Sequence, residues 1–504
     1  MKAVLSVYDK TGLVDFARGL VGLGYEIHST GGTRKALAEA GVPVASVSDL
    51  TGFPEIMGGR VKTLHPGVHA GILANREEPE HMRQLAEQGL AAIDLVAVNL
   101  YPFEATISRP GVTLADAIEN IDIGGPTMVR ASAKNHASVV IVVDPAEYPS
   151  LLEELRAGGP TAGRRQELAR AAFAHTAAYD SAIATYLAGL EEAEGWPRDF
   201  SIGGHKRQDL RYGENPHQTA ALYMSGTGAG VAGAEQLHGI ELSYNNIVDV
   251  DAAWELVQDL PVPSAAIIKH TNPCGAAAGE TLAEAYRKAY ECDTTSAFGG
   301  IVALNQPCDR DTARRIAEIF VEVVAAPGYS DEAVEILSAK KKVRILRVGP
   351  ARPSPVLKMV SGGFLVQGSD SLAVERAAMR SVGRRQPTED EWEQLLFAWR
   401  VVKHVKSNAI VLANDHTAVG VGAGQMSRVE SVRLAAERAG GRAAGTVLAS
   451  DAFFPMPDGV EAAADAGVTA IIQPGGSIKD PDVLAVADAR GIAMVYTGAR
   501  HFRH

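Results

Sequence analysis

The feature that most constrains the fold is a repeated alternation of short apolar runs with amphipathic segments. Residues 2–8 form a mostly apolar run, and apolar side chains then recur at helical spacing over 13–21. Further buried strands are expected at 25–28, 95–99 and 137–143. Strands that alternate with helices through short connections predict an α/β fold built on a parallel, doubly wound sheet.

The second part of the chain repeats this alternation after a change in composition. A helical stretch rich in Ala and Glu covers about 164–194, and the run GWPRDFSIGG, rich in Gly and polar residues, follows. We therefore expect a domain boundary near 193–200, with one domain over 1–195 and another over 196–504. The runs AAIIKH, GGIVAL, NAIVLA and VTAIIQ predict buried strands in the second domain. No short-period repeat is visible, although this reading would miss a distant duplication.

Charge and cysteine content limit the partners and the compartment. Lys and Arg number 48 and Asp and Glu 60, which gives a net charge of -12 and speaks against general binding of nucleic acid. Small anionic substrates stay open, because local basic clusters decide their binding. Three cysteines without a CxxC motif favour a reducing compartment over a disulfide framework. No apolar run reaches 18 residues, so we expect no membrane span, and we expect a cytoplasmic protein.

Two segments of the first domain offer groups that suit an anion. STGGT, residues 29–33, lies between an expected strand and an expected helix, where backbone N–H groups and hydroxyls can hold a phosphate. A turn with a threonine N-cap is the alternative. GGRVKTLHP, residues 58–66, carries two cations and a hydroxyl that an oxyanion can use. A solvated basic loop is the alternative there.

A tyrosine and a carboxylate are placed where such a fold binds ligands. Asn99 and Tyr101 in NLYPF follow an apolar strand, and open α/β sheets bind ligands at the carboxyl ends of their strands. Asp122 in IDIGGP precedes two glycines and an expected helix that has Arg130 and Lys134 on one face. A core-edge tyrosine and a simple helix cap are the alternatives.

The run IKHTNPCG is the most informative of the second domain. Lys269 and His270 end an expected strand, and histidine transfers protons near neutral pH while an adjacent cation can tune it or donate a proton. A zinc site made by His270 with the cysteines is disfavoured, because Cys274, Cys292 and Cys308 lie 18 and 16 residues apart. RYGENPHQ offers groups for a phosphate, GVGAGQ is a weak dinucleotide signal, and DAFFPMP can stack a flat ring or form a buried turn.

Together these motifs resemble one family, the bifunctional purine biosynthesis proteins. SVYDKTG, GGRVKTLHP, NLYPF and IDIGGPTMVRASAKNH are similar to its cyclohydrolase half. RYGENPHQ, IKHTNPCGAA, SAFGGIVAL, SNAIVLA, GVGAGQMSR, SDAFFP and RHFRH resemble its formyltransferase half. The resemblance covers essentially the whole chain in the family's order.

The resemblance implies two activities. A formyl group would pass from 10-formyltetrahydrofolate, a co-substrate, to the ribonucleotide phosphoribosylaminoimidazolecarboxamide (AICAR). The resulting formyl-AICAR would close to inosine monophosphate (IMP) with loss of water, and no catalytic metal is implied. The implied fold is a methylglyoxal-synthase-like domain followed by two cytidine-deaminase-like subdomains. The implied assembly is a homodimer with the formyltransferase sites at the subunit interface.

The resemblance also implies the residues of the cyclohydrolase site. Its expected catalytic residues are Lys62, Tyr101, Asp122 and Lys134. Its expected nucleotide-binding residues are Lys10, Thr30, Gly31, Gly32, Thr33, Arg60, Thr63, Asn99, Gly124 and Gly125. One departure from the family's motif is Tyr8, at a position where serine is common. Asp122 would take the amide proton while Lys62 and Tyr101 stabilise the oxyanion.

In the formyltransferase site, the resemblance implies His270 as the base and Lys269 as the proton donor to the leaving nitrogen, with Asn408 positioning the carboxamide. The residues expected to bind the ribonucleotide or the folate are Arg211, Tyr212, Phe298, Glu322, Arg428, Phe453, Pro455, Arg500 and Phe502. Glu322 stands where some members have aspartate.

Three other functions compete with this one. A zinc-dependent nucleoside deaminase suits the expected second fold, but the chain lacks an H-x-E motif followed by P-C-x-x-C. A phosphate lyase such as methylglyoxal synthase accounts for the first domain only. A non-catalytic nucleotide sensor would keep the glycine-rich loops but has no need of a Lys–His pair.

Overall fold

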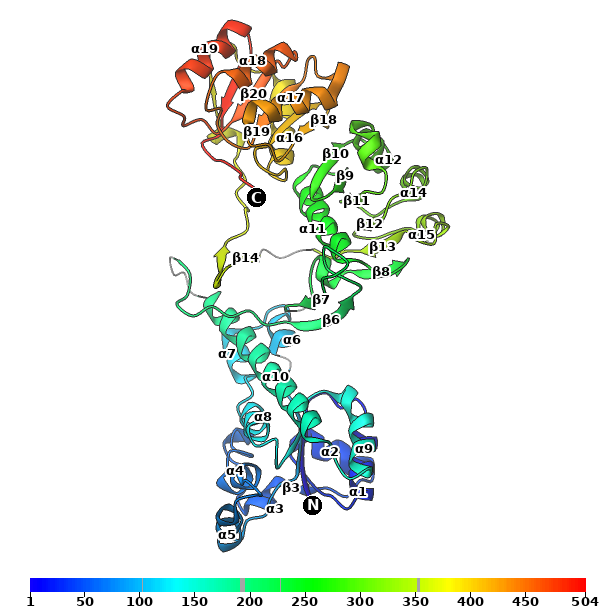
Figure 1. Cartoon of the computed structure of the whole chain (residues 1–504), viewed down its shortest axis with the longest axis vertical. Helices are drawn as coiled ribbons and strands as arrows, with labels where there is room; N and C mark the ends of the chain where they lie inside the picture. Colours follow the sequence, from blue (N-terminus) through cyan, green and yellow to red (C-terminus); the bar gives the residue numbers. More distant parts are fainter. Residues whose placement is uncertain (102, 191–194, 227, 351–353) are drawn as a thin grey trace. The chain divides into compact units, whose positions relative to one another are not determined.

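The chain folds into two compact units, which the computed structural model describes for residues 1–101, 103–190, 195–226, 228–350 and 354–504 (Figure 1). The first unit runs from Met1 to His205, and the second holds Lys206–Met224 and Gly228–His504. Residues 191–194, over which part of the expected boundary falls, and Pro102 of the NLYPF motif lie outside the described residues.

The first unit is built on a five-stranded sheet with the order β3-β2-β1-β4-β5, in which every pair of neighbours is parallel. The parallel α/β sheet expected from the sequence is therefore confirmed. The strands are β1 (Lys2–Val7), β2 (Glu26–Ser29), β3 (Ala45–Ser46), β4 (Leu95–Asn99) and β5 (Val140–Val142). The helices are α1 (Leu13–Gly22), α2 (Gly31–Glu39), α3 (Val47–Thr51), α4 (Pro66–Leu73), α5 (Pro79–Glu87), α6 (Phe103–Ile107), α7 (Leu114–Glu119), α8 (Gly124–Lys134), α9 (Tyr148–Arg156) and α10 (Ala162–Ala188).

The apolar spacing of α1 is the reason it packs on this sheet. Leu13, Phe16, Ala17 and Leu20 are buried, as helical periodicity requires of a face that meets a core. The ring of Phe16 stacks on Tyr148 with 4.3 Å between ring centroids. Burial of each large side chain contributes about 1.5–3 kcal/mol to the free energy of unfolding, so this face holds α1 and α9 against the sheet.

The second unit contains a twelve-stranded sheet with the order β16-β21-β20-β19-β17-β18-β10-β9-β11-β12-β13-β8. Two two-stranded sheets, β6–β7 and the antiparallel pair β14–β15, also belong to this unit. The strands are β6 (His205–Leu210), β7 (Ala220–Met224), β8 (Glu235–His238), β9 (Ser264–Lys269), β10 (Asn272–Ala278), β11 (Ile301–Leu304), β12 (Val323–Ala326), β13 (Arg344–Arg347), β14 (Val356–Val360), β15 (Gly363–Gln367), β16 (Arg380–Val382), β17 (Ile410–Asn414), β18 (Thr417–Gly422), β19 (Val447–Ser450), β20 (Ala470–Gln473) and β21 (Ala493–Tyr496). The helices are α11 (Tyr244–Asp259), α12 (Leu282–Cys292), α13 (Thr294–Ala297), α14 (Arg310–Ile316), α15 (Asp331–Ser338), α16 (Glu389–Val402), α17 (Arg428–Ala439), α18 (Asp458–Asp465) and α19 (Asp480–Arg490).

This large sheet consists of two halves with the same topology. Counted from its outer edge, one half has the order β8-β13-β12-β11-β9-β10, and the other has the order β16-β21-β20-β19-β17-β18. In each half an edge strand and a helix precede an antiparallel hairpin, after which helices and parallel strands alternate. The halves join where β10 and β18 pair antiparallel, at Ala277 and Thr417. The resemblance implies two subdomains, and the two halves have the same strand order; their likeness to cytidine deaminases stays a prediction.

Glycine allows the same close approach of a helix to a strand in both halves. A Cβ atom on Gly275 would lie 2.0 Å from the carbonyl oxygen of Ala289 in α12, and one on Gly420 would lie 2.1 Å from that of Ala435 in α17. No larger residue fits without moving the helix. The equivalent placement of these two glycines supports the duplication at the level of single residues.

Among the described residues, no helix is both long enough and apolar enough to cross a membrane.

Candidate active sites

The carboxyl ends of β1, β2 and β4 meet at one edge of the first unit's sheet, because the three strands are parallel neighbours. Asn99, at the end of β4, ties the loop after β1 to this edge. Its Oδ1 accepts hydrogen bonds from the backbone N–H groups of Tyr8 and Asp9 at 2.7 and 2.9 Å, and its Nδ2 donates to the Asp9 carbonyl at 3.1 Å. The side-chain amide of Asn99 therefore positions the loop that carries Lys10.

Two lysines lie beside the glycine turn that begins α2. A Cβ atom on Gly31 would lie 3.5 Å from the Lys62 Nζ, and one on Gly32 would lie 4.0 Å from the Lys10 Nζ. Thr33, one residue further, is held by its hydroxyl, which bonds both the N–H and the carbonyl of Val7 at 3.0 and 2.9 Å. The hydroxyl of Thr30 lies 3.3 Å from that of Ser6. A helix N-terminus flanked by two ammonium groups can bind a phosphate.

Two neighbouring cations already have carboxylate partners. Lys62 lies 3.4 Å from Glu55, and Arg60 pairs with Glu119 on the surface. An anion at this turn would compete with Glu55 for Lys62. Glu55 was not identified from the sequence, because nothing in its local pattern marks a partner for Lys62.

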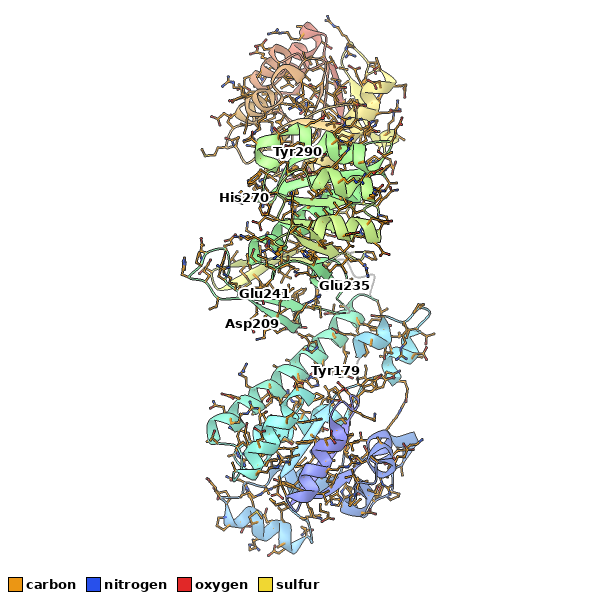
Figure 2. The ribbon with its side chains drawn as sticks, turned by 90° about the vertical axis from the view of Figure 1, so that its right-hand side faces the viewer. Tyr179, Asp209, Glu235, Glu241, His270 and Tyr290 are labelled. Carbon is orange, nitrogen blue, oxygen red and sulfur yellow. The ribbon has the colours of Figure 1, made fainter. Side chains whose placement is uncertain are left out.

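Asp122 is a half-buried carboxylate at the start of α8. Its Oδ1 accepts the N–H of Gly125 at 2.8 Å, and its own N–H donates to the hydroxyl of Tyr179 at 2.8 Å (Figure 2 labels Tyr179, on α10). Burial raises the pKa of the Asp122 carboxyl, against the opposite effect of the N–H groups of Gly125 and Gly124. A raised pKa and a fixed orientation suit a general base.

Glycine is required at the first two positions of α8, Gly124 and Gly125. A Cβ atom on Gly124 would lie 2.5 Å from the hydroxyl oxygen of Thr63, and one on Gly125 would lie 2.5 Å from the Asp122 Oδ2. The two glycines therefore let Thr63 and Asp122 come together at the start of α8.

Tyr101 follows β4 and packs its ring edge against Tyr8, with 4.6 Å between ring centroids. The family's serine position therefore holds an aromatic ring that contacts an expected catalytic residue. This contact restricts the orientation of the Tyr101 ring.

Lys134 lies apart from these residues. It is the last residue of α8, whereas Asp122 precedes the first, and ten residues of helix span about 15 Å. Lys134 and Arg130 line a separate cavity of about 830 Å³ with α4 and α10. Lys62, Asp122 and Lys10 thus lie around the strand ends, while Lys134 does not join them within this unit.

The second cluster forms at the β9–β10 hairpin. Lys269 ends β9, and His270 and Thr271 form a two-residue turn with φ values of 53° and 61° (Figure 2 labels His270). This left-handed conformation costs roughly 1–2 kcal/mol for each residue other than glycine. The carboxylate of Asp249 offsets that cost by accepting the N–H of His270 at 3.2 Å and that of Thr271 at 2.7 Å. The Lys269 Nζ donates to the Phe298 carbonyl at 3.0 Å.

Asn408 lies at the matching edge of the second half, just before β17. Its Nδ2 donates to the carbonyls of Gln425 and Met426 at 2.9 and 3.2 Å, and its Oδ1 accepts from Arg428 at 2.9 Å. Arg428 is itself buried and paired with the fully buried Asp451. This ion pair neutralises Arg428 and anchors Asn408.

The two halves bring these groups to one edge of the sheet. The side chain of Asn272 donates to the carbonyl of His270 at 3.1 Å and accepts the N–H of Lys406 at 3.0 Å, which links the hairpin to the segment before Asn408. Lys269, His270 and Gln425 line one cavity of about 320 Å³. Lys269 and His270 therefore share a cavity with Gln425, whose carbonyl accepts a hydrogen bond from Asn408.

The other residues expected to bind the ribonucleotide or folate fall into two groups. Glu322 bonds Asn246 and Arg344, each at 3.0 Å, so its carboxylate is part of an internal ion pair. The second group presents rings and cations at the surface: Arg211 lies 5.2 Å from the ring centroid of Tyr212, Arg500 lies 4.7 Å from that of Phe502, and Phe298, Phe453 and Pro455 are exposed.

The C-terminal segment is held beside Asn408. Ser407 and Arg503 exchange two hydrogen bonds, from the Ser407 N–H to the Arg503 carbonyl at 2.9 Å and from the Arg503 N–H to the Ser407 hydroxyl at 3.1 Å. His501 is 2% exposed, lies 2.6 Å from Asp370 and packs on the ring of Trp399. Arg500 is therefore presented by an ordered segment.

Residues predicted from motifs thus account for most of both clusters, but three supporting residues were missed. Asp249, Asn272 and Asp451 hold the hairpin and Arg428 in place. Asp451 occurs in the SDAFFP motif and could have been proposed, whereas Asp249 gives no signal within its amphipathic helix. Within the described part of the chain, no group of three or more His, Cys, Asp or Glu residues could hold a metal ion.

Comparison with known proteins identifies the family. A family model described as "AICARFT/IMPCHase bienzyme" matches residues 132–438, which is more than half of the chain. The chain belongs to this bienzyme family. A second model, described as "MGS-like domain", matches residues 12–127. The bienzyme family carries AICAR formyltransferase and IMP cyclohydrolase, so the chain is a bifunctional enzyme with these two activities.

Curated relatives match the bienzyme over its full length. A protein named "Bifunctional purine biosynthesis protein PurH" from Anoxybacillus flavithermus is 55% identical over 100% of this chain and 99% of its own length. Proteins of the same name from Bacillus mycoides and Halalkalibacterium halodurans are each 54% identical with the same coverage. A solved structure titled "Crystal structure of ForH" is 40% identical, covers 37% of this chain and 97% of its own, and has a TM-score of 0.34.

Proposed function

We propose that the two activities reside in separate units of the chain. The first unit would close formyl-AICAR to IMP, and the second would transfer the formyl group from 10-formyltetrahydrofolate to AICAR. The observation that carries this proposal is that each unit gathers its own set of proton-transfer and anion-binding groups: Lys62 and Asp122 in one, and Lys269, His270 and Asn408 in the other.

For formyl transfer, the AICAR amine attacks the formyl carbon of the folate. This amine is a weak nucleophile because its lone pair is delocalised into the ring and the carboxamide, so a base is needed. His270 would accept the amine proton, and Lys269 would donate a proton to the folate nitrogen as the C–N bond breaks. Formyl-AICAR and tetrahydrofolate leave. The hydrogen bond from the Lys269 Nζ to the Phe298 carbonyl supports this role, because it fixes the Lys269 ammonium group beside the hairpin.

For ring closure, the carboxamide nitrogen attacks the new formyl carbon. Asp122 would accept the amide proton, and Lys62 and Tyr101 would stabilise the oxyanion. This oxygen gains the amide proton and the proton of the formamide nitrogen and leaves as water, while a C=N bond forms between that nitrogen and the former formyl carbon. The glycine turn at the start of α2, with Lys10, Thr30 and Thr33, would hold the phosphate. Lys134 stays an expected catalytic residue from the resemblance alone, because about 15 Å of helix separates it from Asp122.

The remaining expectations extend this proposal. We propose a cytoplasmic homodimer whose formyltransferase sites lie at the subunit interface, with Arg211, Arg428 and Arg500 toward the ribonucleotide and Phe298 and Phe453 toward the folate. The exposed rings and the ordered C-terminal segment support this arrangement, since they offer aromatic faces and a cation at the surface.

Two substitutions test whether the two activities reside in separate units. The full chain is supplied with AICAR and 10-formyltetrahydrofolate, and formyl-AICAR and IMP are measured separately. His270→Ala should lower formyl transfer by about 10²–10⁴-fold while added formyl-AICAR still closes to IMP. Lys62→Ala should have the reverse effect, so each variant is the control for the other. Equal loss of both activities in either folded variant would contradict the proposal.

A further inference from the structure

The corner between α12 and α13 lines the cavity of about 320 Å³ that also holds Lys269 and His270. Asp293 is the single residue between the two helices, and its side chain accepts the N–H of Ser296 at 2.8 Å, which makes it the N-cap of α13. A helix of four residues has few hydrogen bonds of its own, so it depends strongly on its cap. Asp293 therefore fixes the position of α13 at the wall of this cavity.

The position of α13 in turn sets the position of a backbone carbonyl that holds Lys269. Phe298 directly follows the last residue of α13, and its carbonyl accepts the hydrogen bond from the Lys269 Nζ at 3.0 Å. The N–H of Gly300 donates to the Ala297 carbonyl at 3.0 Å, which closes the turn around Phe298 against α13. An ammonium group with a fixed acceptor samples fewer positions, as a proton donor to a leaving nitrogen requires.

Two arginines from the other half of the large sheet hold the same corner. Arg438 on α17 pairs with the Asp293 carboxylate at 2.6 Å, and the side chain of Asp293 is 17% exposed. Arg442 donates to the carbonyls of Glu291 and Cys292, the last two residues of α12, at 2.6 and 2.8 Å. A cation suits this place, because the C-terminal end of a helix carries a partial negative charge. The corner is therefore held by residues of both halves.

We propose that Asp293 is a positioning residue of formyl transfer, which acts through α13 and the Phe298 carbonyl on the ammonium group of Lys269. This inference rests on the proposed role of Lys269 as the proton donor to the folate nitrogen. Arg438 supports the same function, since it holds Asp293 from the second half of the sheet. Neither residue has to contact a substrate for this role. Loss of Asp293 should therefore slow the chemical step more than it weakens the binding of AICAR.

Steady-state kinetics of formyl transfer in full-chain variants test the inference. Asp293→Ala should lower kcat at saturating folate by about tenfold or more and leave the KM for AICAR within about twofold, because a misplaced proton donor slows chemistry without weakening AICAR binding. Asp293→Asn should lose less activity, since asparagine also caps helices. Arg438→Met should resemble Asp293→Asn, whereas Arg438→Lys should keep most of the turnover, because it retains a cation beside Asp293.

Asp309 provides the matched control. Its side chain caps another short helix, α14, by accepting the N–H of Thr312 at 2.8 Å, but it is exposed and does not line the cavity. Asp309→Ala should therefore leave the kcat of formyl transfer unchanged. Closure of added formyl-AICAR to IMP should be unchanged in every variant, and thermal melts establish that each is folded. Equal loss of formyl transfer in Asp309→Ala and Asp293→Ala would overturn the inference, because the loss of any helix cap would then explain it.

A Lys269→Met background tests whether Asp293 acts through Lys269. Lys269→Met alone should lower kcat by about 10²–10⁴-fold. Adding Asp293→Ala should cause no further loss, because the group through which Asp293 acts is already absent. A further loss in the double variant, or wild-type turnover in a folded Asp293→Ala protein, would overturn the inference and leave the role of Lys269 intact. Wild-type turnover in Lys269→Met would contradict the proposed function itself, and the inference with it.

Discussion

At the scale of single residues, two carboxylates hold the expected formyltransferase residues in place. Asp249 accepts the N–H groups of His270 and Thr271, two residues in the left-handed conformation, and so fixes the turn that carries His270. Asp451 forms an ion pair with Arg428, and Arg428 donates a hydrogen bond to Asn408. Asp451 occurs in the SDAFFP motif, whereas Asp249 is at a position that local sequence does not mark as functional. Both support expected site residues of the formyltransferase cluster, and that cluster depends on their hydrogen bonds.

Asp249→Asn should lower the kcat of formyl transfer by about tenfold or more, because an asparagine accepts at one oxygen only and turns a donor toward the second N–H. The KM for AICAR should change little and cyclisation should be unaffected, since Asp249 positions a catalytic group of one site. Steady-state kinetics of both reactions provide the measurement, with Asp311→Asn, an exposed carboxylate at the start of α14, as the matched control. Wild-type turnover in a folded Asp249→Asn protein would contradict the role of Asp249.

Asp122→Asn should stabilise the folded protein and remove the proposed general base of ring closure. Burial raises the folded-state pKa of Asp122, so its ionised form costs stability, and this cost is complete above the folded pKa and absent below the unfolded value. The variant should therefore melt at a higher temperature than the wild type at pH 7.5, and the difference should disappear near pH 3.5. Cyclisation should fall about 10²–10⁴-fold. Equal melting temperatures at pH 7.5 would show that the Gly125 hydrogen bond offsets the burial.

At the scale of elements, helix starts and strand ends carry the sites. α2 and α8 both begin at the edge where β1, β2 and β4 end, and the glycines of their first turns leave room for Lys62, Thr63 and Asp122. In the second unit the equivalent role falls to a hairpin and to the segment before β17, each at the same edge of the large sheet. The C-terminal segment then packs beside Asn408 and adds Arg500.

Arg500→Ala should raise the KM for AICAR by about tenfold, because Arg500 is on an ordered segment and can bond a phosphate with two donors. Its thermal midpoint should match that of the wild type, since Arg500 stacks only on the exposed Phe502. His501→Ala makes the contrasting change, because the buried His501 packs on Trp399, and it should lower the thermal midpoint by several degrees. An unchanged KM for AICAR in Arg500→Ala would remove Arg500 from the binding site.

At the scale of the whole molecule, each unit has its own core. The buried cluster of the first unit draws its residues from Ala3 to Tyr179, and the clusters of the second unit begin at Ala234. Because each unit builds its own buried cluster from its own described residues, each satisfies the condition for folding alone.

A fragment of residues 1–205 should therefore fold cooperatively and close formyl-AICAR to IMP at a rate within a few-fold of that of the full chain. It should not transfer formyl groups, because it lacks Lys269, His270 and Asn408. Circular dichroism during heating and the rate of IMP formation are the measurements, with the fragment's Lys62→Ala variant as the inactive control. A folded fragment without cyclohydrolase activity would show that the first unit needs the second for its chemistry.

What could be predicted from sequence is what depends on neighbours along the chain. The apolar period of α1, the strands β1, β2, β4 and β5, and the polar groups at or just after the ends of those strands, such as Thr30, Asn99 and Tyr101, all result from local spacing, whereas the two-residue β3 was not predicted. Short motifs with unusual residue pairs, above all Lys269 with His270, also identify themselves without any knowledge of their partners.

Only the tertiary structure decided which of these segments meet. The two-fold arrangement of the twelve strands depends on the pairing of β10 with β18, which lie about 140 residues apart in a chain whose halves share little visible sequence. The hydrogen bonds from the His270 and Thr271 N–H groups to Asp249 have the same origin, because they join α11 to the β9–β10 hairpin. Local pattern determines which face of an element is buried, but the partner of a buried carboxylate is set by non-local packing that no short stretch of sequence records.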